Sequence, residues 1–305
     1  MTFRKTKLLP LLLLLAGCAL APMSAAAQQE RTEWPALTAA HAPDAAMEAR
    51  ISRIVAGMTL AQKVGQTTQP DVRYITPEEV TQYYIGSVLN GGGAWPAMNK
   101  HATVADWAAL SDRYHDAALA ADMTVKIPLI WGTDAVHGHN NVSGATLFPH
   151  NIGLGAAHDP ELIERIGRAT ARQVRATGIT WVFAPTLAVG ENRRWGRTYE
   201  SYSSDPQLVA EYGEALVRGL QGNLTGDGDV VATAKHYLGD GGTFNGQDQG
   251  EARASLSEMI NRHGAGYYST IEAGVQTVMA SYSSWNDVAA GHDYGKMHGS
   301  REMLT

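Results

Sequence analysis

The sequence predicts an α/β fold built as a (β/α)8-type (TIM-like) barrel. Short apolar runs that end in Gly, Asp or Asn alternate with longer helical stretches, which is typical of βαβ units around a parallel sheet. Four of the five clear runs are followed closely by polar side chains suited to binding or catalysis. The strands of a barrel all open onto one mouth, whereas a doubly wound sheet gathers its ligand groups mainly at a switch point. Polar groups spread over successive strands therefore favour the barrel.

The expected elements follow from hydrophobic periodicity. Strands are predicted at residues 85–89, 127–131, 179–183, 230–234 and 275–280, and residues 64–68 are a candidate for a sixth. Helices are predicted at residues 45–58, 104–123, 160–177, 206–220 and 256–273. The first of these helices places five apolar residues on one face, namely Met47, Ile51, Ile54, Val55 and Met58.

Helix starts carry recognisable caps. Asp159 precedes Pro160 and Asp205 precedes Pro206, so each helix begins with an acidic N-cap and a proline in its first turn. Thr59 is expected to cap a short second helix that runs past residue 60.

The number of strands falls short of a closed barrel, which needs eight. The sequence reaches Thr305 inside a helix that is expected to begin near Ser300. An unclosed barrel leaves its last strand with unpaired backbone groups. We therefore expect residues 28–305 to be an incomplete barrel domain, truncated before closure, from a longer protein.

The amino terminus has the layout of an export signal. Residues 1–27 combine a basic start, an apolar run and a small-residue region that ends at Ala27. The apolar run is too short to cross a bilayer, which takes about 20 residues. The segment around Cys18 also resembles a lipobox, in which this single cysteine would carry a lipid anchor. Cleavage after Ala27 and lipidation at Cys18 both predict an extracytoplasmic protein, periplasmic or secreted.

Composition excludes several classes of protein. The chain has 24 Lys+Arg against 30 Asp+Glu, a formal net charge of −6, whereas nucleic-acid binders need a basic surface. Hydrophobic residues make up 44% and charged residues 18%, as in folded globular chains. A single cysteine excludes a disulfide scaffold. No cofactor is expected.

The first candidate site segment follows the second predicted strand. Asp134 lies just past the strand end, where its carboxylate can accept hydrogen bonds from two vicinal hydroxyls of a sugar. The alternative is an Asp that only caps a turn. His137 and His139 lack a third ligand at useful spacing, so we predict hydrogen bonds within the loop and no metal site.

Three further segments follow later strands. Arg197 lies close to Glu200, which can orient its guanidinium, although a surface cluster of ion pairs is equally compatible. Lys235 and His236 place two donors at a strand end, unless the lysine merely extends from the rim. Tyr282 and Trp285 are candidates for contact with a sugar or, alternatively, ordinary core residues.

Four motifs taken together resemble glycoside hydrolase family 3. They are WGTDAVHGHNN, RRWGRTYESYS, AKHYLGDGG and SYSSWN, in this order, within a resemblance that runs from about Met58 to about Asn286. They are most similar to the exo-acting β-glucosidases and β-D-glucan glucohydrolases. The resemblance implies a first barrel domain followed by a second α/β domain, which is absent from this sequence.

The resemblance also implies the roles of individual residues. Asp134, Arg197, Lys235 and His236 would bind sugar hydroxyls, and Tyr282 would stand beside the nucleophile. The family's nucleophile is an Asp in a motif like SDW, and no Ser-Asp-Trp occurs here. Its acid/base is usually a Glu of the second domain, so both groups are expected beyond Thr305.

The function that follows is hydrolysis of β-glucosides or β-glucans. The whole protein is expected to release β-D-glucose from non-reducing ends with retention of configuration. This chain is expected to be inactive alone, because the nucleophile and the acid/base are expected beyond Thr305. Two alternatives remain open: a non-catalytic extracytoplasmic sugar-binding module, and an unrelated periplasmic α/β binding protein.

Overall fold

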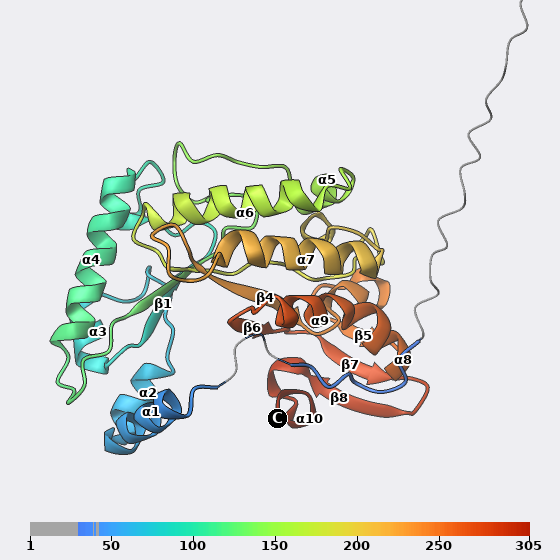
Figure 1. Ribbon diagram of the computed structural model, residues 1–305, viewed down its shortest axis with the longest axis horizontal. Coiled ribbons are helices and arrows are strands. Elements are labelled where there is room, and N and C mark those ends of the chain that lie inside the picture. The colour runs from blue at the N-terminus through green and yellow to red at the C-terminus, as the bar shows by residue number, and fades with distance from the viewer. Residues whose placement is uncertain (1–29, 39, 41–42) are drawn as a thin grey trace, which may run out of the picture. The chain divides into compact units, whose positions relative to one another are not determined.

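A five-stranded sheet is the frame of the computed structural model, which describes residues 30–38, 40 and 43–305 (Figure 1). Its strands are β1 (Ser87–Asn90), β2 (Ile130–Thr133), β3 (Trp181–Val182), β4 (Val231–Tyr237) and β6 (Thr277–Ala280). The strands lie in chain order and every neighbouring pair is parallel. A doubly wound sheet would reverse its strand order at a switch point. The order therefore confirms the predicted fold class, an α/β barrel wall that stays open over the described residues.

Helices connect the strands and pack against one another along the sheet. α4 (Val104–Ala120) joins β1 to β2, α6 (Pro160–Arg175) joins β2 to β3, α7 (Pro206–Gln221) joins β3 to β4, and α9 (Ala265–Glu272) precedes β6. α6 packs against α7, which packs against α9 (Figure 1). The remaining α-helices are α1 (Ala45–Gly57), α2 (Leu60–Gln66), α3 (Pro77–Tyr83), α5 (Asn151–Gly155), α8 (Leu256–Glu258) and α10 (Arg301–Leu304).

The predicted caps are confirmed. The Asp159 carboxylate accepts a hydrogen bond from the Leu162 amide at 2.8 Å, and Asp205 accepts one from the Gln207 amide at 2.9 Å. Thr59 and Gln62 form a reciprocal capping box at the start of α2. These side chains satisfy amides that the first helical turn leaves without partners.

The proposed sixth strand at residues 64–68 is wrong. Its first three residues belong to α2, because the capping box at Thr59 fixes a helical start directly before them. The extended segment begins later, where the Val72 amide donates to the Leu89 carbonyl and the Leu89 amide donates to the Pro70 carbonyl. The free edge of β1 is therefore paired with residues 70–72.

The helix predicted over residues 256–273 is interrupted. A π-helical turn, η5 (Met259–His263), separates α8 from α9, and the Gly264 amide donates back to the Met259 carbonyl. A Cβ at Gly264 would lie 2.4 Å from the Tyr268 hydroxyl and 2.7 Å from the Ile260 carbonyl oxygen. The wide turn therefore depends on a glycine at this position.

A second, three-stranded sheet was missed by the sequence analysis. It contains β5 (Glu251–Arg253), β7 (Ser284–Asp287) and β8 (His292–Lys296), with β7 in the middle. β5 is parallel to β7, and β8 is antiparallel to it. Trp285 of β7 is fully buried and stacks on Tyr294 at 3.9 Å, so it belongs to the core and presents no face to a sugar.

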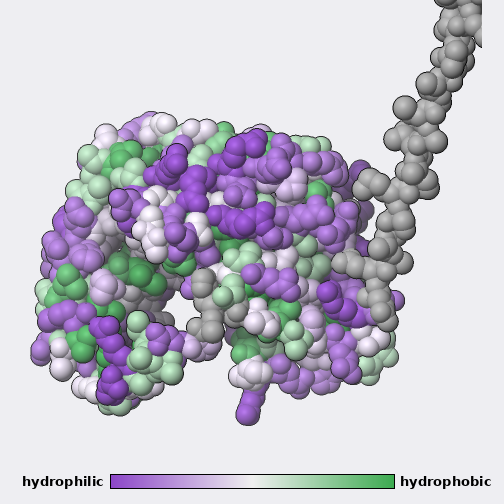
Figure 2. All heavy atoms as spheres, in the orientation of Figure 1, coloured by the Kyte–Doolittle hydropathy of each residue, from purple (hydrophilic) through white to green (hydrophobic). Residues whose placement is uncertain are grey.

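The apolar face of α1 is helical as predicted, but most of it stays exposed. Met47, Ile51 and Val55 are all exposed, and α1 contains no buried residue. Leu60 and Val64 of α2 are exposed as well. Figure 2 shows hydrophobic residues on the surface in this region, at the lower left.

The predicted export signal at residues 1–27 and the lipobox at Cys18 lie outside the described residues. Within the part of the chain that the structure describes, no helix is both long enough and apolar enough to cross a membrane.

Candidate functional site

A cavity of about 230 Å³ lies where β2, β3 and β4 end. Pockets for drug-sized molecules measure about 300–1,000 Å³, so this cavity is on the scale of a smaller ligand. Its lining contains both signs of charge and several rings: Gly92, Asp134, Val136, His137, Asn140, His150, Arg197, Tyr199, Glu200 and Lys235. Residues after successive strands therefore meet in one place, as the barrel prediction requires.

Asp134 and Lys235 form the first pair in the cavity. Asp134 follows β2 directly, and its backbone is held by Asn90 and Asn141, which bond its amide and its carbonyl. The Lys235 Nζ donates to Asp134 Oδ1 at 2.8 Å. Lys235 is only 2% exposed, whereas the Asp134 side chain is 36% exposed. The carboxylate therefore keeps an accessible side, and the ammonium has donors beyond the one that Asp134 uses.

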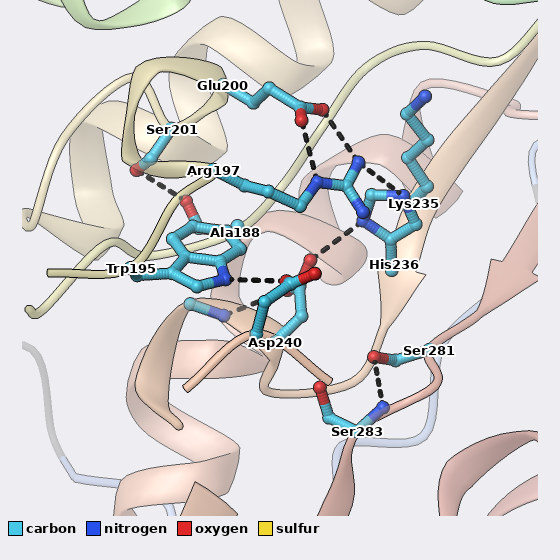
Figure 3. A network of polar contacts seen from close by, with 12 residues as sticks. Ala188, Trp195, Arg197, Glu200, Ser201, Lys235, His236, Asp240, Ser281 and Ser283 are labelled. Carbon is cyan, nitrogen blue, oxygen red and sulfur yellow. Dashed lines mark hydrogen bonds and ion pairs between the residues drawn. The ribbon is translucent and has the colours of Figure 1, made fainter. Parts of the chain in front are cut away.

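Arg197 and Glu200 form the second pair (Figure 3). The short helix η2 (Thr198–Glu200) turns Glu200 back toward Arg197. Arg197 Nε donates to Glu200 Oε1 at 2.7 Å and Nη2 donates to Oε2 at 2.8 Å, a two-point contact. Burial acts to lower the pKa of Arg197, but the hydrogen bond and charge of Glu200 outweigh it and raise that pKa. The guanidinium is therefore a fixed, permanent positive charge.

His236 lies behind Arg197. Its Nε2 is 3.1 Å from Arg197 Nη2, and its Nδ1 is 2.8 Å from Asp240 Oδ2 (Figure 3). Asp240 begins η3 (Asp240–Gly242), and its second oxygen accepts from the Gly241 amide. A Cβ at Gly241 would lie 2.4 Å from the Val189 carbonyl oxygen, so this turn packs closely on the loop after β3. Backbone packing thus sets where Asp240 points.

Three rings form another wall of the cavity. His137 and His150 lie with ring centroids 4.2 Å apart, and Tyr199 meets His150 edge-on at 4.8 Å. The His137 Nδ1 lies 2.9 Å from the Phe148 carbonyl, which ties the two ends of this loop together. The cavity lining therefore combines the flat, partly apolar surfaces of these rings with charged groups.

The structure brings together most of the predicted site residues. Asp134, Arg197 and Lys235 line the cavity, and Glu200 orients the guanidinium as predicted. His236 contacts Arg197 but is not part of the lining. Asp240 was missed, although its spacing four residues after His236 was a usable signal.

Tyr282 lies apart from this group. The residue is 63% exposed, and its ring packs edge-on against His298 at 5.3 Å. It does not line the cavity. Its role beside a nucleophile stays a prediction.

The histidine loop is held by hydrogen bonds, as predicted. His139 is fully buried, with Nε2 3.0 Å from the Thr177 hydroxyl, which itself donates to the Val174 carbonyl. Burial lowers the pKa of His139 to about 4. Among residues 30–38, 40 and 43–305, no three His, Cys, Asp or Glu side chains are grouped to hold a metal ion.

The sequence of this chain matches a known protein family and several of its members. The model of the glycosyl hydrolase family 3 N-terminal domain matches residues 59–305. A lysosomal beta glucosidase of Dictyostelium discoideum is 33% identical over 277 residues, which is 84% of this chain and 33% of that protein. A periplasmic beta-glucosidase of Salmonella typhimurium is 26% identical over 81% of this chain and 31% of its own length. This chain thus spans about a third of the relatives it matches.

Solved structures of related enzymes have a similar fold. The crystal structure of an exo-1,3/1,4-beta-glucanase from a Pseudoalteromonas species superposes with a TM-score of 0.83 at 48% identity, covering 90% of this chain and 34% of that chain. A beta-glucosidase mutant from Listeria innocua in complex with laminaribiose gives a TM-score of 0.64 at 25% identity, covering 78% and 33%.

Proposed function

Because the chain belongs to glycosyl hydrolase family 3, we propose that it supplies the sugar-binding part of a β-glucosidase-type O-glycosyl hydrolase. The proposed substrate is a β-glucoside or β-glucan oligosaccharide, from which β-D-glucose is released at the non-reducing end. The relatives named above are beta glucosidases and an exo-glucanase, which supports this substrate class.

One observation carries the proposal. A single cavity of about 230 Å³ is lined by Asp134, Arg197 and Lys235. Asp134 follows β2, Arg197 lies in the segment after β3, and Lys235 lies near the end of β4. Asp134 accepts hydrogen bonds from sugar hydroxyls, while Arg197 and Lys235 donate to sugar oxygens. Hydrogen bonds to charged groups are roughly twice as strong as neutral ones, which suits a small, strongly hydrated ligand.

The retaining reaction is proposed for the whole protein. It needs two carboxyl groups about 5–5.5 Å apart, one as nucleophile and one as acid/base. Both carboxylates in this cavity already hold cations, since Asp134 pairs with Lys235 and Glu200 pairs with Arg197. We therefore assign the catalytic pair to other parts of the protein, with Tyr282 beside the nucleophile, and expect no turnover from the 305-residue chain alone.

An extracytoplasmic location accompanies this function. The relative from Salmonella typhimurium is named periplasmic and the one from Dictyostelium discoideum lysosomal. Together with the export signal read from residues 1–27, these names support delivery outside the cytoplasm.

The test combines binding with turnover. NMR titration of the 305-residue chain with D-glucose should give saturable shifts near the cavity, and Asp134→Ala should abolish them. The same preparation should release no nitrophenol from an aryl β-glucoside above a denatured control. Absence of glucose binding would refute the sugar-binding assignment, and clear turnover would refute the claim that the chain is inactive alone.

A further inference from the structure

Four fully buried polar atoms come from α4, from the ends of β1 and β2, and from the loop after β2. None of them has a hydrogen-bond partner among the described residues: Asn90 Nδ2, Trp107 Nε1, Thr133 Oγ1 and His139 Nδ1. Leaving a buried donor or acceptor unpaired destabilises a fold, so most such groups are paired with protein atoms or with ordered water. These four residues are called the buried polar cluster below.

The members of the buried polar cluster are joined by a series of contacts. The rings of Trp107 and His139 lie with centroids 6.1 Å apart, and those of Trp107 and Trp131 lie 5.9 Å apart. Trp131 Nε1 donates to Asn90 Oδ1 at 2.8 Å. Asn90 is paired in register with Thr133 on the neighbouring parallel strand, so both side chains lie on the same face of the sheet. The unpaired atoms therefore belong to one buried region.

The neighbours of His139 fix which of its ring nitrogens carries the proton. The Thr177 hydroxyl donates to the Val174 carbonyl at 2.6 Å, so its oxygen accepts from His139 Nε2 at 3.0 Å. The ring is neutral at pH 7, because burial lowers the pKa of His139 to about 4. Nδ1 is therefore a bare lone pair that needs a donor.

The indole of Trp131 fixes the Asn90 amide in a similar way. Because Trp131 Nε1 can only donate, the Asn90 oxygen faces it and Nδ2 is directed elsewhere. Asn90 Nδ2 and Trp107 Nε1 are donors only, whereas His139 Nδ1 is an acceptor only. The Thr133 hydroxyl can do either. A ligand of this region must therefore both accept and donate hydrogen bonds.

From this set of donors and acceptors we propose that the buried polar cluster binds one internal water molecule. The water accepts from Trp107 Nε1 and Asn90 Nδ2, and it donates to His139 Nδ1 and Thr133 Oγ1. Buried waters commonly make two to four such bonds. A cation is excluded by the two N–H donors and an anion by the lone pair of His139. An apolar ligand would leave all four atoms unpaired.

This water links α4, β1 and β2 behind a residue of the cavity. The Asn90 carbonyl accepts from the Asp134 amide, and Thr133 directly precedes Asp134 in the chain. The inference does not depend on what the cavity binds. It is therefore tested separately from the proposed function.

A crystal structure of the 305-residue chain at a resolution that shows ordered waters tests the site directly. We expect one water oxygen within about 2.7–3.2 Å of the four cluster atoms. A direct contact between Trp107 Nε1 and His139 Nδ1, or a site without water, would overturn the proposal.

A matched pair of substitutions tests the site in solution. Thr133→Val removes one acceptor of the water at nearly constant volume and should lower the melting temperature by about 2–4 °C. Thr186→Val is the control, because Thr186 Oγ1 is also buried without a partner in the described structure but follows β3, outside the buried polar cluster. It should leave the melting temperature unchanged or raise it. The same result for Thr133→Val would show that its hydroxyl is truly unpaired, against the proposal.

NMR of the ¹⁵N-labelled wild-type chain completes the test. The imidazole shifts of His139 should report a proton on Nε2 and a bare Nδ1 that accepts a hydrogen bond. A proton on Nδ1 would remove the acceptor on which the site depends and would refute it. So would a scalar coupling between the nitrogens of Trp107 and His139, since this coupling requires a direct N–H···N bond.

Discussion

Asp134 and His139 lie on the same loop, yet the two side chains belong to regions of opposite character. Asp134 joins the charged cluster, defined here as Asp134, Arg197, Glu200, Lys235, His236 and Asp240. His139 joins the aromatic layer, which consists of Trp107 and Tyr114 of α4, Trp131 of β2 and His139 itself. One loop after β2 thus supplies both a ligand-binding surface and a packed interior.

The charged cluster is costly to fold. Lys235 is almost fully buried, and its partner Asp134 is partly exposed to solvent. Burying an ammonium costs several kcal/mol, which one ion pair rarely repays. Titratable groups that gather in a cavity are candidates for a functional site. We infer that this region is kept for what it binds.

The aromatic layer, in contrast, stabilises the fold. Trp107 and Trp131 lie with ring centroids 5.9 Å apart, and Trp107 and His139 lie 6.1 Å apart. All of these rings are buried between α4, β2 and the following loop. Aromatic side chains bury large apolar areas, so this layer stabilises the platform on which Asp134 stands. The comparison predicts that substitutions in one region alter ligand binding and those in the other alter stability.

The largest effect is expected for Trp107→Ala. Removing a fully buried tryptophan should lower the free energy of unfolding by about 3–5 kcal/mol, as measured by chemical denaturation. Trp107→Phe is the control, because the indole N–H has no partner in the described structure and its loss should cost less. If the folded Ala variant lost glucose affinity while keeping its stability, the division into two regions would be wrong.

The next largest effect is a loss of stability in acid, caused by His139. Its pKa is lowered from 6.5 to about 4 because the ring is buried, so the unfolded chain binds a proton that the folded chain does not. Above about pH 6.5 the ring is neutral in both states, so proton binding costs the folded protein nothing. As the pH falls toward 4, proton binding to the unfolded chain lowers the free energy of unfolding by roughly 3 kcal/mol. Buried His263, whose pKa is also lowered by burial, adds to the loss in acid, so the His139 part is the difference between the wild type and a His139 variant in denaturation between about pH 7 and pH 4.

His139→Gln provides the comparison for that pH series. Gln keeps a donor for the Thr177 hydroxyl but does not titrate, so the pH slope should flatten. Substituting the exposed His101 by Gln should leave the slope as it is in the wild type. An unchanged slope in the His139 variant would assign the acid sensitivity to other groups.

A smaller effect, on binding alone, is expected for Lys235→Met. The side chain keeps its approximate volume but loses its charge, and Asp134 stays partly hydrated, so stability should stay within about 1 kcal/mol or rise. Glucose affinity should fall about tenfold, since a charged donor to the sugar is gone. Calorimetry and thermal denaturation of the same samples measure both quantities. A marked loss of stability with unchanged affinity would show that the cluster holds the fold together.

The two regions also differ in how far the sequence could predict them. The convergence of Asp134, Arg197 and Lys235 followed from the alternation of strands and helices, because parallel strands end at one edge. For the aromatic layer, hydrophobic periodicity predicted only the helix and the strand that carry the rings, and not the contacts between the rings. Asp240 was missed because its direction depends on the close packing of Gly241 against Val189, a tertiary contact.

Other differences have similar causes. The strands of the second sheet are short, and β5 covers only Glu251–Arg253. They form because β7 pairs with β5 on one side and with β8 on the other, and such pairing is not visible in a short segment of sequence. The π turn before Gly264 requires a glycine because a Cβ there would lie 2.4 Å from the Tyr268 hydroxyl, a tertiary constraint. In contrast, helix starts depend on side chains within one turn, and for this reason they were predicted correctly at Asp159 and Asp205.

Asp159 provides the smallest prediction and tests whether the two regions are coupled. Asp159→Ala removes the cap at the start of α6 and should lower the free energy of unfolding by about 1 kcal/mol, or the melting temperature by about 2–4 °C. Asp159→Asn keeps a side-chain oxygen for the Leu162 amide and should lose little. α6 comes after α5, which follows the loop that carries both Asp134 and His139. A cap variant that altered glucose affinity would therefore mean that the two regions are coupled through this helix. Unchanged affinity, with the modest loss of stability, means that the charged cluster is positioned by its own ion pairs and hydrogen bonds.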